Sequence, residues 1–211
     1  MKKEIIVGLA SVLLVSACAS GPSNRVLYGG GIGAITGAGL GTLAGGDDKR
    51  NAAIGAVIGG IAGAAVGDYM DKQEAALRKA TEGTQIEVVR QGDQIQLVAP
   101  SDVTFNVGSA SIQPGFYTTL NDVATALKQY PSTAIDILGH ASTDGPEDLN
   151  QRLSEQRASA VQTYLNGQGV NSVRMKAVGF GETRPLPGIP GTSPANRRVE
   201  LVLTPVVDNQ T

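Results

Sequence analysis

Hydrophobic and polar positions in the second half of the chain follow two different periodicities. Ile86–Val89 and Ile95–Val98 are short apolar runs on either side of Gly92 and Asp93. A glycine and an aspartate between two runs of β-prone residues are typical of a tight turn. The pattern therefore predicts a hairpin of two short strands.

Two helices are predicted where apolar residues recur every three or four positions. The first ends before Pro131, because proline cannot continue a helix. Its apolar positions are Phe116, Leu120, Val123, Ala124 and Leu127. The second amphipathic helix extends from Leu149 to Leu165, and Gly167 and Gly169 end it.

Four further segments have the composition of strands. They are a brief strand at Val103–Phe105, a buried strand around Ile135–Leu138, a strand over Val173–Phe180 and an alternating strand over Arg197–Leu203. The last of these places Arg197, Val199, Leu201 and Leu203 on one side and Arg198, Glu200 and Val202 on the other. Together with the helices, these strands predict an α+β fold, a sandwich of two helices on one mixed sheet.

The first third of the chain has a glycine repeat instead. One set of glycines is Gly29, Gly33, Gly37, Gly41 and Gly45, and a second set is Gly55, Gly59, Gly63 and Gly67. Four-residue spacing places glycines along one face of a helix, where a second backbone can approach closely. The repeat therefore predicts a helical hairpin that turns at Asp47–Arg50. The alternative from the residues alone is a flexible Gly/Ala tether.

Each uncharged arm of this hairpin, Val26–Gly46 and Asn51–Gly67, approaches the length of a hydrocarbon core of about 30 Å. The hairpin is therefore able to enter a membrane. After it, Asp68–Lys79 carries mixed charges, with Glu74 four residues before Arg78. That spacing predicts an exposed linking helix.

The N-terminus has a basic start, an apolar run over Ile5–Val15 and small residues before Cys18. This order is typical of a secretory signal. Leu14–Cys18 resembles a bacterial lipobox, which implies cleavage before Cys18 and attachment of acyl chains to it. In such lipoproteins Ala19, rather than an aspartate, implies the outer membrane, with the body of the protein in the periplasm. The alternative is an ordinary signal peptide with a chance cysteine.

Composition excludes several classes of function. The net charge of -2 gives no basic face for nucleic acid, and one cysteine cannot form an internal disulfide. One histidine makes a zinc site implausible. His140, Ser142 and Asp144 alternate within one loop without a nucleophile elbow, so they do not predict a hydrolase. We expect neither an enzyme nor a cofactor.

A different chemistry is indicated by Arg157. The row Leu149, Leu153, Arg157 and Val161 is apolar at four-residue spacing except for this arginine. A buried charge needs a partner. The preceding loop offers Asp144 between small residues, so a cation and an anion meet in one pocket, which suits a zwitterionic ligand. The residues also allow Arg157 to extend its charged end to water or to pair with Glu200 or Asp144.

Five motifs in order resemble the OmpA-like C-terminal domain, the peptidoglycan-binding module of many outer-membrane proteins. They are Val103–Phe105, Gly139–His140, Asn150 with Leu153, Ser154, Arg157 and Ala158, Gly179 with Gly181, and Asn196–Glu200. The resemblance covers about residues 100–204 and implies a βαβαβ fold with a further strand. The glycine repeat resembles the glycine-zipper segment of some outer-membrane lipoproteins.

This resemblance also implies a ligand, the diaminopimelate of a peptidoglycan stem peptide. Arg157 matches the arginine that takes the ligand carboxylate. The position of the aspartate that takes the ammonium is occupied by Ser142, and Asp144 is either its substitute or a turn and helix-capping residue. Gly108 stands at another position that is acidic in some members. Asn150 shares a helix face with Arg157 and is a candidate for bonding the peptide, whereas Asn196–Arg198 are expected to support sheet and loop structure.

The resemblance implies an outer-membrane lipoprotein that binds peptidoglycan non-covalently and ties the membrane to the wall. Alternatives are a structural or assembly lipoprotein that associates through Gly29–Gly67, with itself or with other outer-membrane proteins, and an anchoring subunit of an envelope-spanning machine. In both of these, peptidoglycan binding is weak or lost. The predicted organisation is a signal peptide over 1–17, a lipidated segment over 18–28, a glycine-zipper hairpin over 29–70, a charged helical linker over 71–85 and the OmpA-like domain over 86–207.

Overall fold

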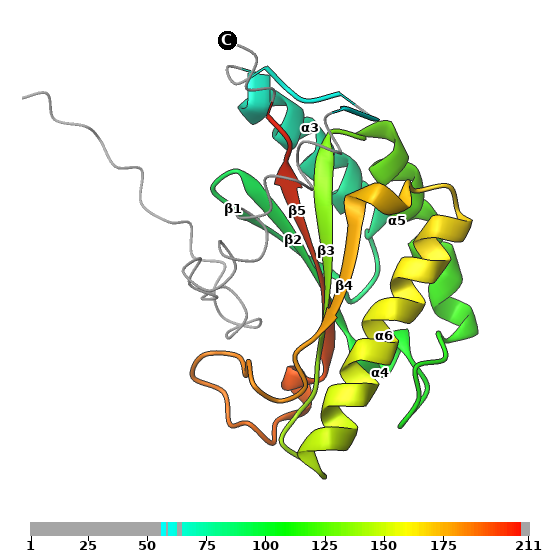
Figure 1. Ribbon diagram of the computed structural model, residues 1–211, viewed down its shortest axis with the longest axis vertical. Coiled ribbons are helices and arrows are strands. Elements are labelled where there is room, and N and C mark those ends of the chain that lie inside the picture. The colour runs from blue at the N-terminus through cyan, green and yellow to red at the C-terminus, as the bar shows by residue number, and fades with distance from the viewer. Residues whose placement is uncertain (1–55, 58, 63–64, 208–211) are drawn as a thin grey trace, which may run out of the picture. The chain divides into compact units, whose positions relative to one another are not determined.

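The structure, a computed structural model, describes residues 56–57, 59–62 and 65–207 and contains one five-stranded sheet. The strands lie in the order β1, β2, β5, β3, β4 (Figure 1). Their bounds are β1 Glu87–Gln91, β2 Gln94–Pro100, β3 Thr133–His140, β4 Met175–Gly179 and β5 Arg198–Pro205. β3 and β4 are parallel and the other neighbours are antiparallel, so the sheet is mixed, as predicted.

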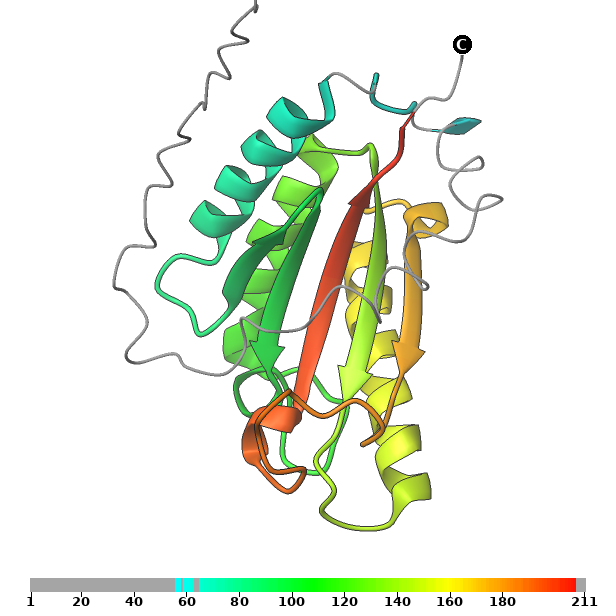
Figure 2. The same cartoon turned by 90° about the vertical axis from the view of Figure 1, so that its left-hand side faces the viewer.

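Helices cover one face of this sheet (Figure 2). The α-helices are α3 Val66–Ala80, α4 Ser101–Thr104, α5 Tyr117–Gln129 and α6 Glu147–Gly167, and the 3-10 turns are η2 Pro114–Phe116, η3 Ser172–Arg174 and η4 Pro194–Asn196. α5 and α6 are the two helices that the apolar spacing predicted, and α5 ends just before Pro131. The α+β fold class is therefore confirmed.

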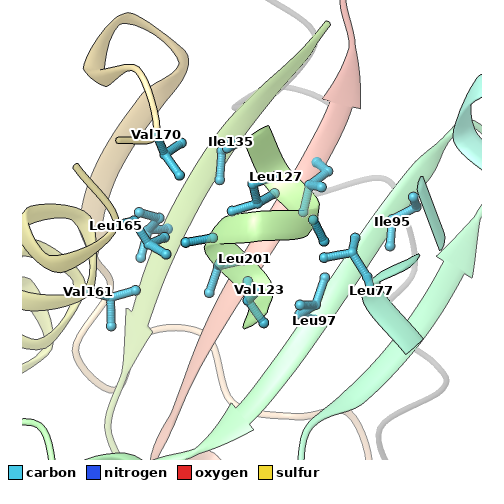
Figure 3. Packing of buried hydrophobic residues seen from close by; sticks show 14 of the residues in the cluster. Leu77, Ile95, Leu97, Val123, Leu127, Ile135, Val161, Leu165, Val170 and Leu201 are labelled. Carbon is cyan, nitrogen blue, oxygen red and sulfur yellow. The ribbon is translucent and has the colours of Figure 1, made fainter. Parts of the chain in front are cut away.

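The core lies between the sheet and the two long helices. Leu97, Ile135 and Leu201 extend from three strands toward α5 and α6 (Figure 3). They meet Val123 and Leu127, and all five side chains are buried. Each such side chain stabilises the fold by about 1.5–3 kcal/mol. Alternation along the strands thus fixes the face on which the helices pack.

β5 is buried on both of its faces. Its core-facing side carries Val199, Leu201 and Leu203, as the alternation predicted. On the other side, Glu200 accepts hydrogen bonds from Arg198 Nε at 2.6 Å and from Gln96 Nε2 at 2.8 Å. The buried carboxylate therefore has charged and polar partners in its own sheet.

The predicted linking helix exists as α3, but its prediction as exposed is wrong for one face. Met70, Gln73 and Leu77 are buried, and the Tyr69 hydroxyl accepts a hydrogen bond from the Ser132 N–H at 2.8 Å. Tyr69 also packs edge-on against Tyr130, which follows α5. Apolar residues at three- and four-residue spacing thus attach α3 to the domain, although the charges between them had indicated solvent.

Part of the second glycine arm also differs from the prediction. Residues 59–62 are not helical, and Gly59 has a φ of +88°, in the left-handed region that favours glycine. Ile61 is buried, and its N–H donates to the Val206 carbonyl at 2.8 Å beside the end of β5. A continuous helix over Asn51–Gly67 is therefore corrected.

The remaining N-terminal predictions lie outside the described residues. These are the signal peptide 1–17, the lipidated Cys18 with its segment, and the first glycine arm. None of the helices in the described ranges combines the length and apolar character needed to cross a bilayer.

Val103–Phe105 is the third correction, because it is not a strand. Ser101–Thr104 form the single turn α4, and Phe105 makes only an isolated bridge with Ile112. The Thr104 hydroxyl donates to the Pro100 carbonyl at 2.8 Å, which stabilises the turn. The β-prone composition here serves to bury Phe105, which is 1% exposed.

Candidate functional site

The candidate site lies at one end of the sheet, where four segments converge. They are the turn α4, the loop after β3, the first half of α6 and the start of β5, all at the lower end of the domain in Figures 1 and 2. These segments enclose a pocket of about 480 Å³. It is lined by Ser101, Asp102, Phe105, Asn106, Val107, Gly108, Ala141, Ser142, Asp144, Asn150, Leu153, Arg157 and Arg197.

Two glycines place α6 against the sheet. Gly139 and Gly179 are partners in the β3–β4 register. A Cβ on Gly139 would collide with the Ser154 carbonyl, and one on Gly179 would collide with the backbone of Glu155. The Ser154 hydroxyl also accepts a hydrogen bond from the Gly181 N–H at 2.8 Å. This close contact fixes the distance between the sheet and α6, the helix that carries Arg157.

Arg157 is buried at the side of the pocket, only 5% exposed. Its Nε donates to the Ser109 carbonyl at 3.0 Å, and its guanidinium lies 5.2 Å from the centroid of the Phe105 ring. Among the residues that the structure describes, no carboxylate lies within ion-pair distance of it. Burial lowers the pKa of Arg157 from its usual value. The site therefore contains a desolvated cation that feels the charge of Asp102 but has no carboxylate within ion-pair distance among the described residues.

The acidic side of the pocket is built around Asp144 and Asp102. Asp144 Oδ2 accepts a hydrogen bond from the Ser142 hydroxyl at 3.0 Å. Arg197 lies between the two carboxylates, at 3.6 Å from Asp144 Oδ2 and 3.7 Å from Asp102 Oδ2. Both aspartates are more than half exposed, at 57% and 67%. Their charges thus face the open part of the pocket.

Asn150 holds the loop that presents Asp144. Its amide nitrogen donates to the Ser142 carbonyl at 3.0 Å, to the Asp144 carbonyl at 3.2 Å and to Glu182 Oε2 at 2.7 Å. The predicted residues Arg157, Asp144, Asn150 and Ser142 all line the same pocket. Asn150 is positioned there to shape the loop, because its donors are already engaged.

Sequence reasoning missed Asp102 and placed Arg197 with the structural residues. Asn196 and Arg198 do support the fold, since Asn196 bonds Leu186, Pro190 and Gly191, and Arg198 bonds Glu200. Arg197 is different because it lines the pocket. The sequence did contain a signal for this role: Arg197 is a charged residue on the core-facing side of an alternating strand, at the end of that strand.

His140 lies apart from Ser142 and Asp144. Its ring stacks on Phe180 with centroids 5.5 Å apart, and its Nε2 lies 3.6 Å from Glu200 Oε1. Burial lowers the pKa of His140, so the ring is neutral at pH 7. The Ser142 hydroxyl instead bonds a carboxylate, which does not activate a nucleophile.

Comparison with known proteins gives two family matches. The OmpA family matches residues 104–197, and the YMGG-like Gly-zipper matches residues 1–71. The probable lipoprotein YiaD of Escherichia coli is 40% identical, over 98% of this chain and 100% of its own length. The similarity therefore includes both the glycine repeat and the folded domain.

Two further relatives are similar to the folded domain. The peptidoglycan-binding protein ArfA of Mycobacterium tuberculosis is 36% identical to this chain. The match covers 52% of this chain and 34% of ArfA. A putative MotB-like protein from Desulfovibrio vulgaris has a TM-score of 0.58 at 26% identity, over 69% of this chain and 99% of that one. With its Gly-zipper segment and its folded domain, the chain belongs to the OmpA family.

Proposed function

We propose that this chain is an outer-membrane lipoprotein that binds peptidoglycan non-covalently in the Arg157 pocket and ties the membrane to the wall. The observation that carries the proposal is the buried guanidinium of Arg157, which has no carboxylate within ion-pair distance among the described residues. A buried cation of this kind is stabilised when a ligand supplies the anion. The carboxylates of Asp144 and Asp102 beside it favour a ligand that also carries a positive charge.

The distal end of diaminopimelate in a stem peptide meets both requirements. It carries an ammonium and a carboxylate on one carbon. The planar guanidinium of Arg157 can donate two parallel hydrogen bonds to the carboxylate. The ammonium then lies toward Asp144 and Asp102. Arg197 brings one positive charge beside these two carboxylates, so one negative charge remains for the ammonium. Asp144 thus substitutes for an aspartate at position 142.

The position of the pocket suits a tether. The start of α3 and the end of β5 lie at the upper end of the domain, and α4 and the start of α6, which flank the pocket, lie at the lower end (Figure 2). The glycine repeat and Cys18 precede α3 in the chain. An anchor in the N-terminal segment would therefore join the domain through α3, at the end opposite to α4.

The names of the relatives support the same function. YiaD is described as a probable lipoprotein and ArfA as a peptidoglycan-binding protein. The pocket acts through ion pairs and hydrogen bonds, which is the chemistry of a binding module. We therefore infer a role in anchoring rather than in catalysis.

Removal of Arg157 tests the proposal. We expect Arg157→Ala to lose about 2–5 kcal/mol of binding free energy, because the ligand carboxylate loses its desolvated partner. The measurement is co-sedimentation of the full-length protein in detergent with purified sacculi, with free diaminopimelate as competitor. Arg152→Ala is the matched control, since Arg152 lies on the same helix but is 57% exposed and pairs with Asp148. Equal sedimentation of Arg157→Ala and wild type would refute the proposal.

The anionic side requires a separate test. Asp144→Asn keeps the shape of the side chain and removes the charge, so we expect about a two- to fivefold weaker affinity, limited by the exposure of this carboxylate. The loss should decrease at high salt. Asp148→Asn is the control, because Asp148 is exposed and lies outside the pocket. An unchanged affinity of Asp144→Asn would assign the ammonium to Asp102 alone.

A further inference from the structure

A second groove lies beside the Arg157 pocket, along the outer side of α6. It has a volume of about 680 Å³ and lies between α6, the start of α5 and the segment Ala110–Ile112. α5 and α6 are neighbours on one face of the sheet (Figure 1). We name this feature the tyrosine groove, after Tyr117 and Tyr164 in its lining.

We propose that the tyrosine groove binds the amino-sugar backbone of the same wall strand whose stem peptide occupies the Arg157 pocket. This inference rests on the proposed function. It assigns a second, carbohydrate subsite to a surface that makes no contact with the diamino acid. The occupant is an uncharged sugar chain.

The lining of the groove has the chemistry that sugars require. Pyranose rings present flat C–H faces that pack on aromatic rings, and hydroxyl and amide groups that need hydrogen-bond partners. Tyr117 and Tyr164 pack against each other with ring centroids 4.9 Å apart and planes tilted by 39°, and Tyr117 is 37% exposed, so the pair presents one aromatic platform. The Tyr164 hydroxyl donates to Asn121 Oδ1 at 2.8 Å, which holds its ring in place. An ordered aromatic surface of this kind binds with little loss of entropy.

Polar side chains surround this platform. Gln156, Ser159 and Thr163 extend from α6 into the groove and supply amide and hydroxyl groups. Glu155 is the one charged residue among the lining residues, and its carboxylate accepts a hydrogen bond from Gln151 at 2.6 Å. A surface of amides and hydroxyls with one carboxylate suits a sugar better than it suits a polyanion or an apolar helix.

The tyrosine groove lies next to the Arg157 pocket. The Ser109 carbonyl accepts the hydrogen bond of Arg157, and the residues directly after Ser109 form one wall of the groove. Only this short segment separates the two hollows. A ligand that leaves the Arg157 pocket across it enters the tyrosine groove.

The spacing along α6 fits the length of a stem peptide. Tyr164 follows Arg157 by two helical turns, so it lies about 10 Å further along the helix on nearly the same side. Two extended residues span about 7 Å, and the side chain of the diamino acid adds several more. When the distal end of diaminopimelate binds Arg157, the sugar therefore reaches the platform.

The test compares two ligands that differ only in the sugar. One is the tripeptide that ends in diaminopimelate, and the other is the same tripeptide on its disaccharide. For the full-length protein in detergent, we expect calorimetry to give about three- to tenfold tighter binding of the sugar-bearing ligand. In the double variant Tyr117→Ala with Tyr164→Ala, the ratio of the two affinities should fall to one. Binding of the bare tripeptide should be unchanged.

Two controls separate the subsites. Tyr117→Phe with Tyr164→Phe keeps both ring faces and should retain most of the ratio. The Arg157→Ala variant should bind neither ligand, and this result tests the proposed function separately from the sugar subsite. If wild type binds neither ligand, the proposed function fails and the subsite with it.

Three outcomes would overturn the sugar subsite while the proposed function stands. One is equal affinity of wild type for the two ligands. Another is a ratio that persists in the double alanine variant. The third is a change in oligomeric state of that variant at constant ratio, which would assign the groove to contact with a second copy of the chain.

Discussion

Arg157 and Arg174 show how the same residue type serves two purposes when it is buried. Arg174 is 1% exposed, and its guanidinium donates to the carbonyls of Leu127, Tyr130 and Thr133 at 2.8–2.9 Å. It thereby satisfies two carbonyls at the end of α5 and one at the start of β3. Burial lowers its pKa to about 10. Within the described part of the chain, Arg157 donates to one carbonyl, that of Ser109, so the remaining donors of its guanidinium are available to a ligand.

Glu200 predicts how the stability of the domain depends on pH. Burial raises the pKa of Glu200, but His140 and Arg198 outweigh burial and lower the pKa to about 2. The unfolded chain protonates near 4.5, before the folded one. This group therefore stabilises the fold fully above pH 4.5, by about 3 kcal/mol, and loses that contribution as the pH falls toward 2.

His140 adds a contribution of the same sign. Burial lowers its pKa below 6.5, so the unfolded chain binds the proton first and stability decreases below about pH 6.5. We expect the urea midpoint, followed by circular dichroism, to fall between pH 7 and pH 3. Glu200→Gln should be less stable at pH 7 by about 3 kcal/mol, because Arg198 loses its buried partner. Its midpoint should change less between pH 4.5 and 2.5, and parallel curves would contradict the assignment.

The sequence predicted Arg157 because a charge interrupted an apolar row. It could not predict Asp102 or the pocket role of Arg197 in the same way. These residues lie on segments far apart in the chain, and only the packing of α4 beside β5 brings Asp102 within 3.7 Å of Arg197. No periodicity within either segment records that contact, so it required the structure.

At the scale of elements, local patterns predicted α5, α6, the β1–β2 hairpin and the central strands. They failed where tertiary contacts override composition. The run Val103–Phe105 has the composition of a strand but forms a turn that buries Phe105. α3 has many charges, yet four residues of one face are buried in the domain. A fragment that begins after α3 would expose that surface.

The contact of α6 with the sheet makes a prediction about Gly139. A methyl group at this position has no space, since it meets the backbone of Ser154. We expect Gly139→Ala to destabilise the domain by about 2–3 kcal/mol through overpacking, measured by urea denaturation. It should also weaken binding to sacculi, because α6 carries Arg157 and must move away from β3.

Gly167→Ala is the matched control on α6. Nothing lies within 4 Å of a Cβ at Gly167, and its φ is not in the left-handed region. We expect this variant to be as stable as wild type or slightly more stable, because alanine favours the helix by about 1 kcal/mol. Equal stability of the Gly139 and Gly167 variants would show that α6 tolerates displacement from the sheet.

At the scale of the molecule, the chain has two ends with different chemistry. Cys18 and the glycine repeat precede α3 in the sequence, and the Arg157 pocket is lined by α4, the loop after β3 and α6. A tether requires both ends in one chain. If the proposed tether is correct, separate point variants should disable each end without loss of the other.

This separation makes a prediction for cells. Cys18→Ser should release the protein from membrane pellets, because single or absent acyl chains give only marginal anchoring, while binding to purified sacculi persists. The Arg157→Ala variant should remain in the membrane fraction and no longer bind to sacculi. The measurement is fractionation of each variant into membrane, sacculus and soluble pools, with Arg152→Ala as control. If Cys18→Ser stays in the membrane pellet even from cells whose sacculi have been digested, then the glycine repeat alone anchors the chain and lipidation is not the main attachment.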